Sequence, residues 1–435
     1  MQDACAGAAT KGAATAAPGK NAAAGAAARE APRRPLQGIK VLDLSRALSG
    51  PFCSMALGDL GATVVKVEPS DGGDMTRGWG PFAATQSVYF MSANRSKQSL
   101  ALDFRHPQAG AVLRRIAATS DVVVENFRPG VAEAMGLGYA ALKALNPRLV
   151  YASISGFGST GPARDHPGFD QIAQGHAGLM SLTGDASPTR VGVAIADMTA
   201  GMWTALGIVA ALRTSESTGR GERVETSLLA SLVSLLGVQG QRFLSTGEVP
   251  ERTGNSNPVI SPYGTFTAAD GPINVAPATQ NMWLCLCREM DLPDLPRHPL
   301  YATNADRVTN RAQLNTVLDM RMRERPRAEW VTRFVAAGIP AGLINDLAEV
   351  FADSQVRHCG MARQAVHPVL GDMPQLSLPL KFDSVDVQQP LAAPPMLGQD
   401  TVLSLRGYGF TEDEVAALIA QGVVRQCDAV RPENP

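Results

Sequence analysis

One carboxylate stands apart from its surroundings in the segment 191–213, VGVAIADMTAGMWTALGIVAALR, where Asp197 is the only acid. Apolar side chains follow it at steps of three and four residues, which predicts a helix: Met198, Met202, Ala205, Leu206, Val209 and Leu212. We therefore expect Asp197 at or near the N-cap of a mostly buried helix, where free N–H groups and the helix dipole keep a carboxylate ionised. Small residues leave room beside it for a large ligand: Gly192, Ala194, Ala196, Ala200 and Gly201.

Two roles are open for Asp197. An acid at the start of a helix is usually a cap and nothing more, and the segment alone favours that role. The alternative is a functional carboxylate that faces a large ligand. The rest of the chain has to decide between them.

The chain before this segment alternates short apolar strands with helices. Strands are predicted at 39–44, 63–68, 99–103, 121–126 and 149–155, and helices at 51–61, 106–119 and 130–145. This order predicts an α/β fold, a Rossmann-like doubly wound parallel sheet with its site at the carboxyl ends of the strands. The first strand is followed by SRALSGP (45–51) and not by G-x-G-x-x-G, so the ligand is not held by a glycine cradle for pyrophosphate.

Later segments predict a second domain. A hairpin signal at 263–277 and helical patterns up to 337 indicate a smaller α+β domain over 260–345. The large α/β domain then comprises 36–225 and 346–430, joined to the small one by a connector at 226–259. Residues 1–35 are rich in Ala and Gly, lack large apolar side chains and are expected to form a flexible tail.

Composition narrows the class of protein. The 435 residues are 45% hydrophobic and 18% charged, with a net charge of −1, so no nucleic-acid partner is expected. Apolar runs are interrupted, so no membrane partner is expected either. Six cysteines are scattered, and the Cys285-Leu286-Cys287 pair is interpreted as core packing and not as a metal site. A reducing compartment follows, so we expect a cytoplasmic protein, or a mitochondrial one in a eukaryote.

Many of these segments together resemble class III CoA-transferases. The similarity begins with VLDLSRALSGPF, LGDLGATVVKVE and GGDMTRGWGPF, and continues through NRSKQSLALDFRHPQAG, DVVVENFRPG and LNPRLVYASISGFGSTGP. It extends over GFDQIAQGHAGLMSLTG, IADMTAGM, TGRGERVETSLL and PPMLGQDT. The order is collinear over nearly all of 36–425. The chain is most similar to the succinate–hydroxymethylglutarate type, which transfers CoA among dicarboxylic acids.

The resemblance implies a nucleophilic aspartate, and Asp197 in IADMTAG occupies the matching position. The family's route runs through a mixed anhydride and an aspartyl-CoA thioester. It implies an acyl-CoA donor, succinyl-CoA by our expectation, and a small dicarboxylate acceptor. No tightly bound cofactor is needed beyond CoA as substrate. It also implies a homodimer of two interlocked, ring-like subunits.

The family's CoA contacts fall on seven positions of this chain: Leu48, Ser49, Leu102, Arg105, Asn126, Phe127 and Arg128. The two arginines suit phosphates, and the leucine of the strand with the phenylalanine suits the adenine. Relatives often carry a basic residue at the positions of Pro69 and Ala134, so Arg46 and Arg77 are expected to supply phosphate contacts instead.

The acyl group is expected at positions that match Tyr89, Phe169 and Asp170. Asp170 would orient the substrate, or alternatively cap a helix. A glycine-rich flap is absent, and Gly254 and Asn255 occupy the comparable loop.

Two alternatives remain open. A 2-methylacyl-CoA racemase shares this fold, but in that branch a His precedes the Asp matching Asp170, whereas Phe169 transfers no proton. The racemase's second carboxylate falls near Thr279. The other alternative is a non-catalytic CoA-binding protein. An NAD-dependent dehydrogenase is disfavoured because the glycine fingerprint is missing.

Overall fold

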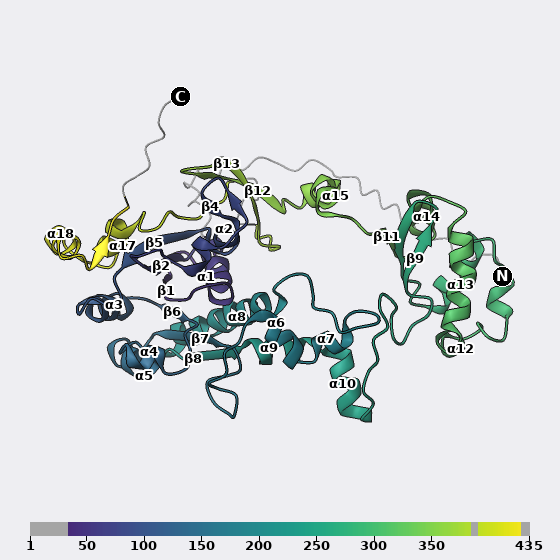
Figure 1. The fold of residues 1–435 in the computed structure, drawn as a ribbon, viewed down its shortest axis with the longest axis horizontal. Coiled ribbons are helices and arrows are strands. Elements are labelled where there is room, and N and C mark those ends of the chain that lie inside the picture. Colours follow the sequence, from purple (N-terminus) through teal and green to yellow (C-terminus); the bar gives the residue numbers. More distant parts are fainter. Residues whose placement is uncertain (1–33, 384–389, 428–435) are drawn as a thin grey trace, which may run out of the picture. The chain divides into compact units, whose positions relative to one another are not determined.

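The computed structural model describes residues 34–383 and 390–427, which form two compact units (Figure 1). The small unit consists of Ser181–Thr189 and Glu251–Asp353. The large unit holds the remaining described residues. The predicted tail at 1–35 lies outside the described residues except for its last two, and the predicted domain boundaries stay predictions.

A seven-stranded sheet forms the centre of the large unit, in the order β14-β5-β2-β1-β6-β7-β8. Its strands are β1 (Lys40–Asp43), β2 (Thr63–Pro69), β5 (Lys97–Leu102), β6 (Val122–Glu125), β7 (Val150–Ser155), β8 (Arg223–Ser227) and β14 (Val424–Arg425). All neighbours pair in parallel except β14, which runs antiparallel to β5. The predicted parallel sheet of an α/β fold is therefore confirmed. The apolar side chains of its inner strands are buried because both faces are covered.

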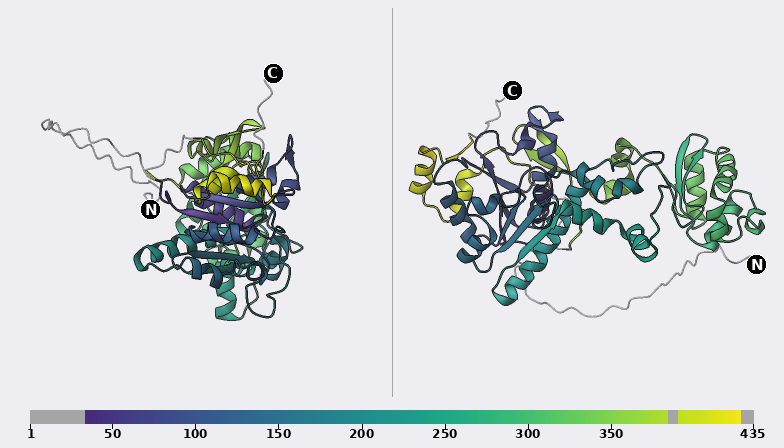
Figure 2. Two further views of the ribbon diagram at one scale, coloured as in Figure 1. Left: turned by 90° about the vertical axis from the view of Figure 1, so that its left-hand side faces the viewer. Right: turned by 60° about the horizontal axis from the view of Figure 1, so that its bottom comes forward.

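Helices cover the two faces of this sheet (Figures 1 and 2). One face packs against α3 (Ala109–Ala118), α5 (Tyr139–Leu145), α17 (Thr401–Gly407) and α18 (Glu412–Ala420). The other face packs against α1 (Ser49–Asp59) and α8 (Ile195–Thr218). A further core joins α6 (Asp170–His176), α8 and α9 (Leu228–Leu235) beside the end of β7. The start of α8 therefore lies over a packed core.

Helix α8 carries Asp197 as its third residue, within the first turn, whereas the N-cap is Ala194. Among the described residues it is the one helix whose length and composition would suit a membrane span, although 44% of its most apolar window is buried. The sequence did not predict a helix of this kind, because its runs of large apolar residues are interrupted. The small residues between them still raise its mean hydropathy. The absence of a membrane partner stays a prediction.

Glycines break two of the predicted helices. The segment 130–145 forms α4 (Val131–Ala134) and α5, separated by Gly136 with φ 68°. The segment 228–243, whose apolar run also predicts a single helix, forms α9 and α10 (Gly237–Thr246), separated at Gly237 with φ 50°. Apolar periodicity continues across both glycines and hides the breaks, since left-handed backbone changes direction without changing the sequence pattern.

The large unit also contains smaller elements. These are η1 (Met75–Gly78), β3 (Phe82–Ala83), β4 (Gln86–Ser87), α2 (Val88–Asn94), α16 (Ser354–His358), β12 (Ala362–His367) and β13 (Gly371–Leu376). Pairing of β3 with β4 and of β12 with β13 makes two short antiparallel ribbons.

The small unit has an antiparallel sheet, β11-β10-β9, against a group of helices. Its elements are β9 (Gly264–Ala268), β10 (Gly271–Val275), α11 (Gln280–Glu289), η2 (Leu295–Arg297), α12 (Asn304–Thr309), α13 (Arg311–Met322), α14 (Arg327–Ala336), β11 (Ala341–Leu343) and α15 (Leu347–Ala352). Helix α7 (Leu179–Leu182) lies where the chain passes between the units. Cys285 and Cys287 are buried in this core, as predicted. No group of His, Cys, Asp and Glu within the described ranges suits a metal ion.

Candidate functional site

Asp197 lies against the start of α1, which follows the loop at the carboxyl end of β1. Ser49, the first residue of α1, lies near its carboxylate, and the hydroxyl and backbone N–H of Ser49 lower the pKa of the acid. The helices approach closely because Gly201 has no side chain: a Cβ there would lie 2.7 Å from the Ser49 carbonyl oxygen. The sequence thus brings two helix starts and one acid together at the expected edge of the sheet.

The environment of Asp197 makes it more basic than an ordinary aspartate. Burial raises its pKa, the nearby Asp170 carboxylate adds to this, and the bonds from Ser49 oppose it, with a net value of about 6. The predicted capping role is not what the structure shows, because the N-cap of α8 is Ala194 and has no side-chain bond. At neutral pH the group is ionised and more nucleophilic than a solvated carboxylate.

The position of Asp170 is fixed by bonds to other elements. Its Oδ1 accepts the N–H of Ala196 at 2.8 Å, and its Oδ2 accepts Nε2 of Gln174 at 2.7 Å. Gln174 is fully buried, and its Oε1 accepts the N–H of Val191 at 2.9 Å. Asp170 thus accepts a backbone N–H from the first turn of α8, and not from the first turn of its own helix, α6. The sequence analysis missed Gln174, although its spacing of four from Asp170 on a helix was a signal.

Two aromatic residues expected near the acyl group lie in the large unit. Tyr89 is half-buried, with its ring edge-on to Trp79 at 5.2 Å. Burial and then the charges of Asp197 and Asp170 raise the pKa of Tyr89, so the three groups share one region. Phe169 is 62% exposed at the start of α6.

The other two predicted acyl-site residues belong to the small unit. Gly254 has φ 55°, and a Cβ there would lie 3.0 Å from Oδ1 of Asp185, in the same unit. Asn255 precedes β9 in the same loop. Their role at the site stays a prediction.

A cavity of about 490 Å³ opens beside the β1–α1 loop. Leu102, Arg105 and Phe127 all line it, as does Arg46, whose guanidinium lies 5.6 Å from the Phe127 ring centroid. Arg128 lines a second cavity of about 270 Å³ that shares Phe127. Four of the seven residues expected to bind CoA therefore line two cavities that share the Phe127 ring, whereas Leu48, Ser49 and Asn126 line neither.

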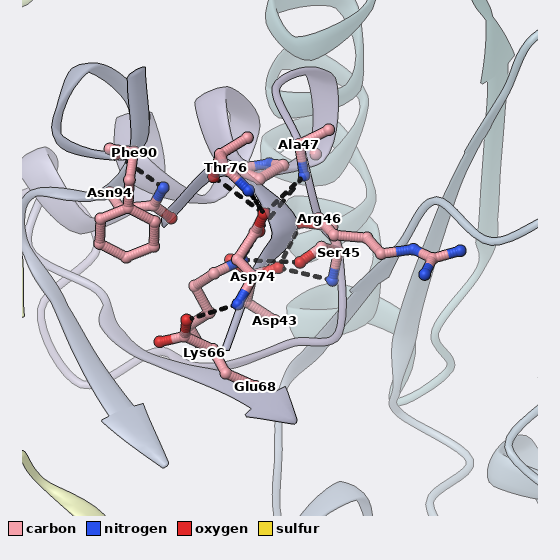
Figure 3. A network of polar contacts seen from close by, with 12 residues as sticks. Asp43, Ser45, Arg46, Ala47, Lys66, Glu68, Asp74, Thr76, Phe90 and Asn94 are labelled. Atoms are coloured by element: carbon pink, nitrogen blue, oxygen red, sulfur yellow. Dashed lines mark hydrogen bonds and ion pairs between the residues drawn. The ribbon is translucent and has the colours of Figure 1, made fainter. Parts of the chain in front are cut away.

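The β1–α1 loop, residues 44–48, is held at three points. Asn126 accepts the N–H of Arg46 at 2.8 Å and donates to its carbonyl at 2.7 Å, and its Nδ2 lies 3.5 Å from Oγ of Ser49. The Asp74 carboxylate accepts the N–H of Ala47, whose φ is 63° (Figure 3). Lys66 donates to the Ser45 carbonyl at 2.7 Å. Leu48, between these points, is half-buried.

Two buried ion pairs lie beside this loop, and each contains a residue that bonds to Ser45. Lys66 pairs with Asp74 at 2.9 Å and Lys97 with Asp43 at 3.1 Å, all four side chains being almost inaccessible. Burial alone would raise the pKa of Asp43, but Lys97 and Lys66 outweigh it and lower the pKa to about 2. The sequence analysis missed this network, because Lys66 lies in an apolar strand and Asp74 in a loop.

Arg77 is committed to the same network. Its Nε bonds to Glu68 at 2.7 Å and its second nitrogen to both Glu68 and the Pro395 carbonyl. These bonds occupy two of its three guanidinium nitrogens, and its contact with phosphate stays a prediction. Arg46 instead extends away from the network toward the open side (Figure 3).

Comparison with known proteins identifies relatives over most of the chain. Residues 36–401 match the sequence model of CoA-transferase family III. Succinyl-CoA:glutarate CoA-transferase of Homo sapiens is 37% identical over 397 residues, covering 90% of each chain. Succinyl-CoA–D-citramalate CoA-transferase of Chloroflexus aurantiacus is 32% identical and covers 90% of this chain and 99% of the relative.

A solved structure shows the same fold. The CAIB/BAIF family protein from Brucella suis matches with a TM-score of 0.77 at 36% identity, covering 86% of this chain and all of the other. Together with the match to the family model, this shows that the chain belongs to CoA-transferase family III and is a CoA-transferase.

Proposed function

We propose that this enzyme transfers CoA from succinyl-CoA to a small dicarboxylic acid, with Asp197 as the nucleophile. Relatives named for glutarate and D-citramalate as acceptors support the substrate class. The chemistry requires no resident cofactor. A racemase is less well supported, because Phe169 stands where that activity needs a proton-transferring side chain.

The observation that carries the proposal is the surroundings of Asp197. Its carboxylate is partly shielded from water, has a pKa of about 6, and lies where Ser49 offers two donors. Four of the residues expected to bind CoA line cavities beside the loop that precedes Ser49: Leu102, Arg105, Phe127 and Arg128. The N–H and O–H groups of Ser49, beside Asp197, are donors of the kind that can stabilise an oxyanion once the carboxylate has reacted.

The reaction is balanced without water. The Asp197 carboxylate attacks the thioester carbonyl, which releases CoA thiolate and leaves a mixed anhydride. The thiolate then attacks the aspartyl carbonyl, releasing succinate and giving an aspartyl-CoA thioester. The acceptor carboxylate displaces CoA from this thioester, and the thiolate attacks the acceptor's acyl carbonyl, which restores Asp197. Excluding water matters throughout, since hydrolysis of any intermediate wastes the thioester.

The decisive experiment combines a substrate screen with trapping of the intermediate. Acyl-CoA donors are incubated with carboxylic acids, and CoA esters are followed by mass spectrometry. We expect succinyl-CoA with five- or six-carbon dicarboxylates to react best. Enzyme quenched with donor alone should give a peptide that contains Asp197 linked to CoA, or its hydroxamate after hydroxylamine.

The matched control is Asp197→Asn, which preserves size and cannot form an anhydride. Transfer should fall by about 10⁴-fold or more while binding of the CoA ester persists. Near-wild-type transfer by this variant, or an adduct on Asp170 instead, would remove Asp197 from the chemistry.

The predicted interlocked homodimer remains part of the proposal. Its support is the number of large apolar side chains that a single chain leaves open on α8, α9 and α10: Met202, Trp203, Leu206, Val209, Val233, Leu235, Val238, Phe243 and Leu244. Apolar surface of this extent typically marks an interface. A second copy of the chain is the occupant that we infer.

A further inference from the structure

We propose that Gln174 is a positioning residue for the nucleophile, which together with Asp170 holds the segment entering α8 and so fixes the direction of Asp197. The inference deepens the proposed function and rests on Asp197 being the attacking group. Nothing in the sequence pattern assigned a role to Gln174.

Three hydrogen bonds form the clamp. Gln174 Nε2 donates to Oδ2 of Asp170 at 2.7 Å, and its Oε1 accepts the N–H of Val191 at 2.9 Å. The other oxygen of Asp170 accepts the N–H of Ala196 at 2.8 Å. The clamp therefore holds the chain six residues before Asp197 and again at the residue next to it.

The chemistry of the groups leaves one arrangement. An ionised carboxylate only accepts and a backbone N–H only donates, so the amide of Gln174 must turn its nitrogen to Asp170 and its oxygen to Val191. Gln174 is wholly inaccessible to water, so both ends of its amide need these partners. No rotation of the amide satisfies the same set.

The clamp acts on the reacting group through geometry. Ala196 precedes Asp197, and the side chain is directed by the backbone of this first turn. Asp197 also lies near Ser49, which lowers its pKa, so a shift of the turn changes its distance from both Ser49 and the substrate carbonyl. Attack depends steeply on such distances, whereas binding of CoA in the cavities beyond the loop does not.

A swap of donor and acceptor tests the idea. In Gln174→Glu two carboxylates face each other, and in Asp170→Asn one oxygen must serve two donors, so each single variant opens the clamp. In the double variant D170N/Q174E, the new amide donates to the new carboxylate, and both backbone N–H groups keep an acceptor. All three bonds return, and only the one between the two side chains reverses its direction.

We expect each of the two single variants, and also Gln174→Met, to lower kcat by about 10- to 100-fold. The single-turnover rate of adduct formation should fall by about the same factor, whereas KM for the acyl-CoA should change by less than about threefold. The double variant should recover to within about fivefold of wild type. Failure of the double variant to exceed the poorer single variant would overturn the proposal.

Thr204→Val serves as the structural control, because Thr204 is buried in α8 and its hydroxyl bonds only to the Ala200 carbonyl, at 2.7 Å. It should lower the melting temperature without changing kcat. If Gln174→Met does the same, Gln174 is merely structural and the proposal fails. Wild-type enzyme is assayed alongside. If it shows neither transfer nor adduct, the proposed function is contradicted. If it transfers CoA and the Gln174 variants do so equally well, only the present inference is contradicted.

Discussion

Asp197 is shielded from water and lies near a second carboxylate, that of Asp170. Both surroundings disfavour its ionised form. In the unfolded chain its pKa is the ordinary 3.8, and in the folded protein it is about 6. The folded state therefore holds the proton more firmly, and ionisation costs stability as the pH rises from 4 to 6. The cost is complete above pH 6 and absent below pH 4.

This sign gives a prediction for Asp197→Asn. The amide removes the repulsion from Asp170 and loses no cap, so at pH 7 the variant should have a higher melting temperature than wild type, at about 1.4 kcal/mol per pKa unit relieved. The gain should vanish near pH 4. Calorimetry at both pH values measures it, and a variant less stable at pH 7 would mean that Asp197 caps its helix after all.

Ser49 should influence the pH below which kcat/KM falls. The limb of kcat/KM is expected near pH 6, where Asp197 becomes protonated. Because the bonds from Ser49 lower the pKa of Asp197, Ser49→Ala should move the limb to higher pH and reduce the rate. Ser217→Ala, exposed at the far end of α8, is the matched control and should leave the profile unchanged. An unmoved limb in Ser49→Ala would exclude a hydroxyl contact.

Among the elements, the β1–α1 loop depends on buried charges more than on its own sequence. Removing Lys66 leaves Asp74 buried without its cation, and breaking such a pair typically costs about 3–5 kcal/mol. We therefore expect Lys66→Met to lower the free energy of unfolding by roughly this amount in urea titrations. Transfer activity should fall as well, because Lys66 holds the Ser45 carbonyl.

The exposed pair Arg115–Glu414 offers the comparison. Glu414→Gln keeps the capping box of α18 and loses only a surface ion pair, so its unfolding curve should nearly coincide with wild type. Equal losses in the two variants would show that burial of the Lys66–Asp74 pair carries no special weight.

These elements also show what the sequence could predict. Apolar runs predicted strands β1, β2, β5, β6 and β7 within one or two residues, because both faces of a parallel sheet are covered and leave a continuous signal. The same burial hid Lys66 and Glu68, which look like solvent-facing residues of a strand until their partners from distant loops are in place. Likewise Asp197 was found from its isolation, whereas Gln174 became visible only through its bonds to Val191 and Asp170.

For the whole molecule, the open apolar side chains of α8 predict self-association. Leu206 is 58% exposed on α8, and Leu403 is 59% exposed on α17, which packs on the opposite face of the sheet. Leu206→Glu should prevent assembly, giving monomer or aggregate in light scattering, whereas Leu403→Glu should remain a dimer. A wild-type monomer at sub-micromolar concentration would contradict the dimer, and binding to lipid vesicles would assign the same face to a membrane.

The chain between the two ends of the Gln174 clamp does not stay in the large unit. Residues 181–189 belong to the small unit, and the chain returns at residue 190, just before Val191. A displacement of residues 181–189 would therefore strain the hydrogen bond between Val191 and Gln174 before it could move Asp197. If Asp197 is the nucleophile, we expect the clamp to isolate it mechanically from residues 181–189, so that the direction of its carboxylate is set within the large unit alone.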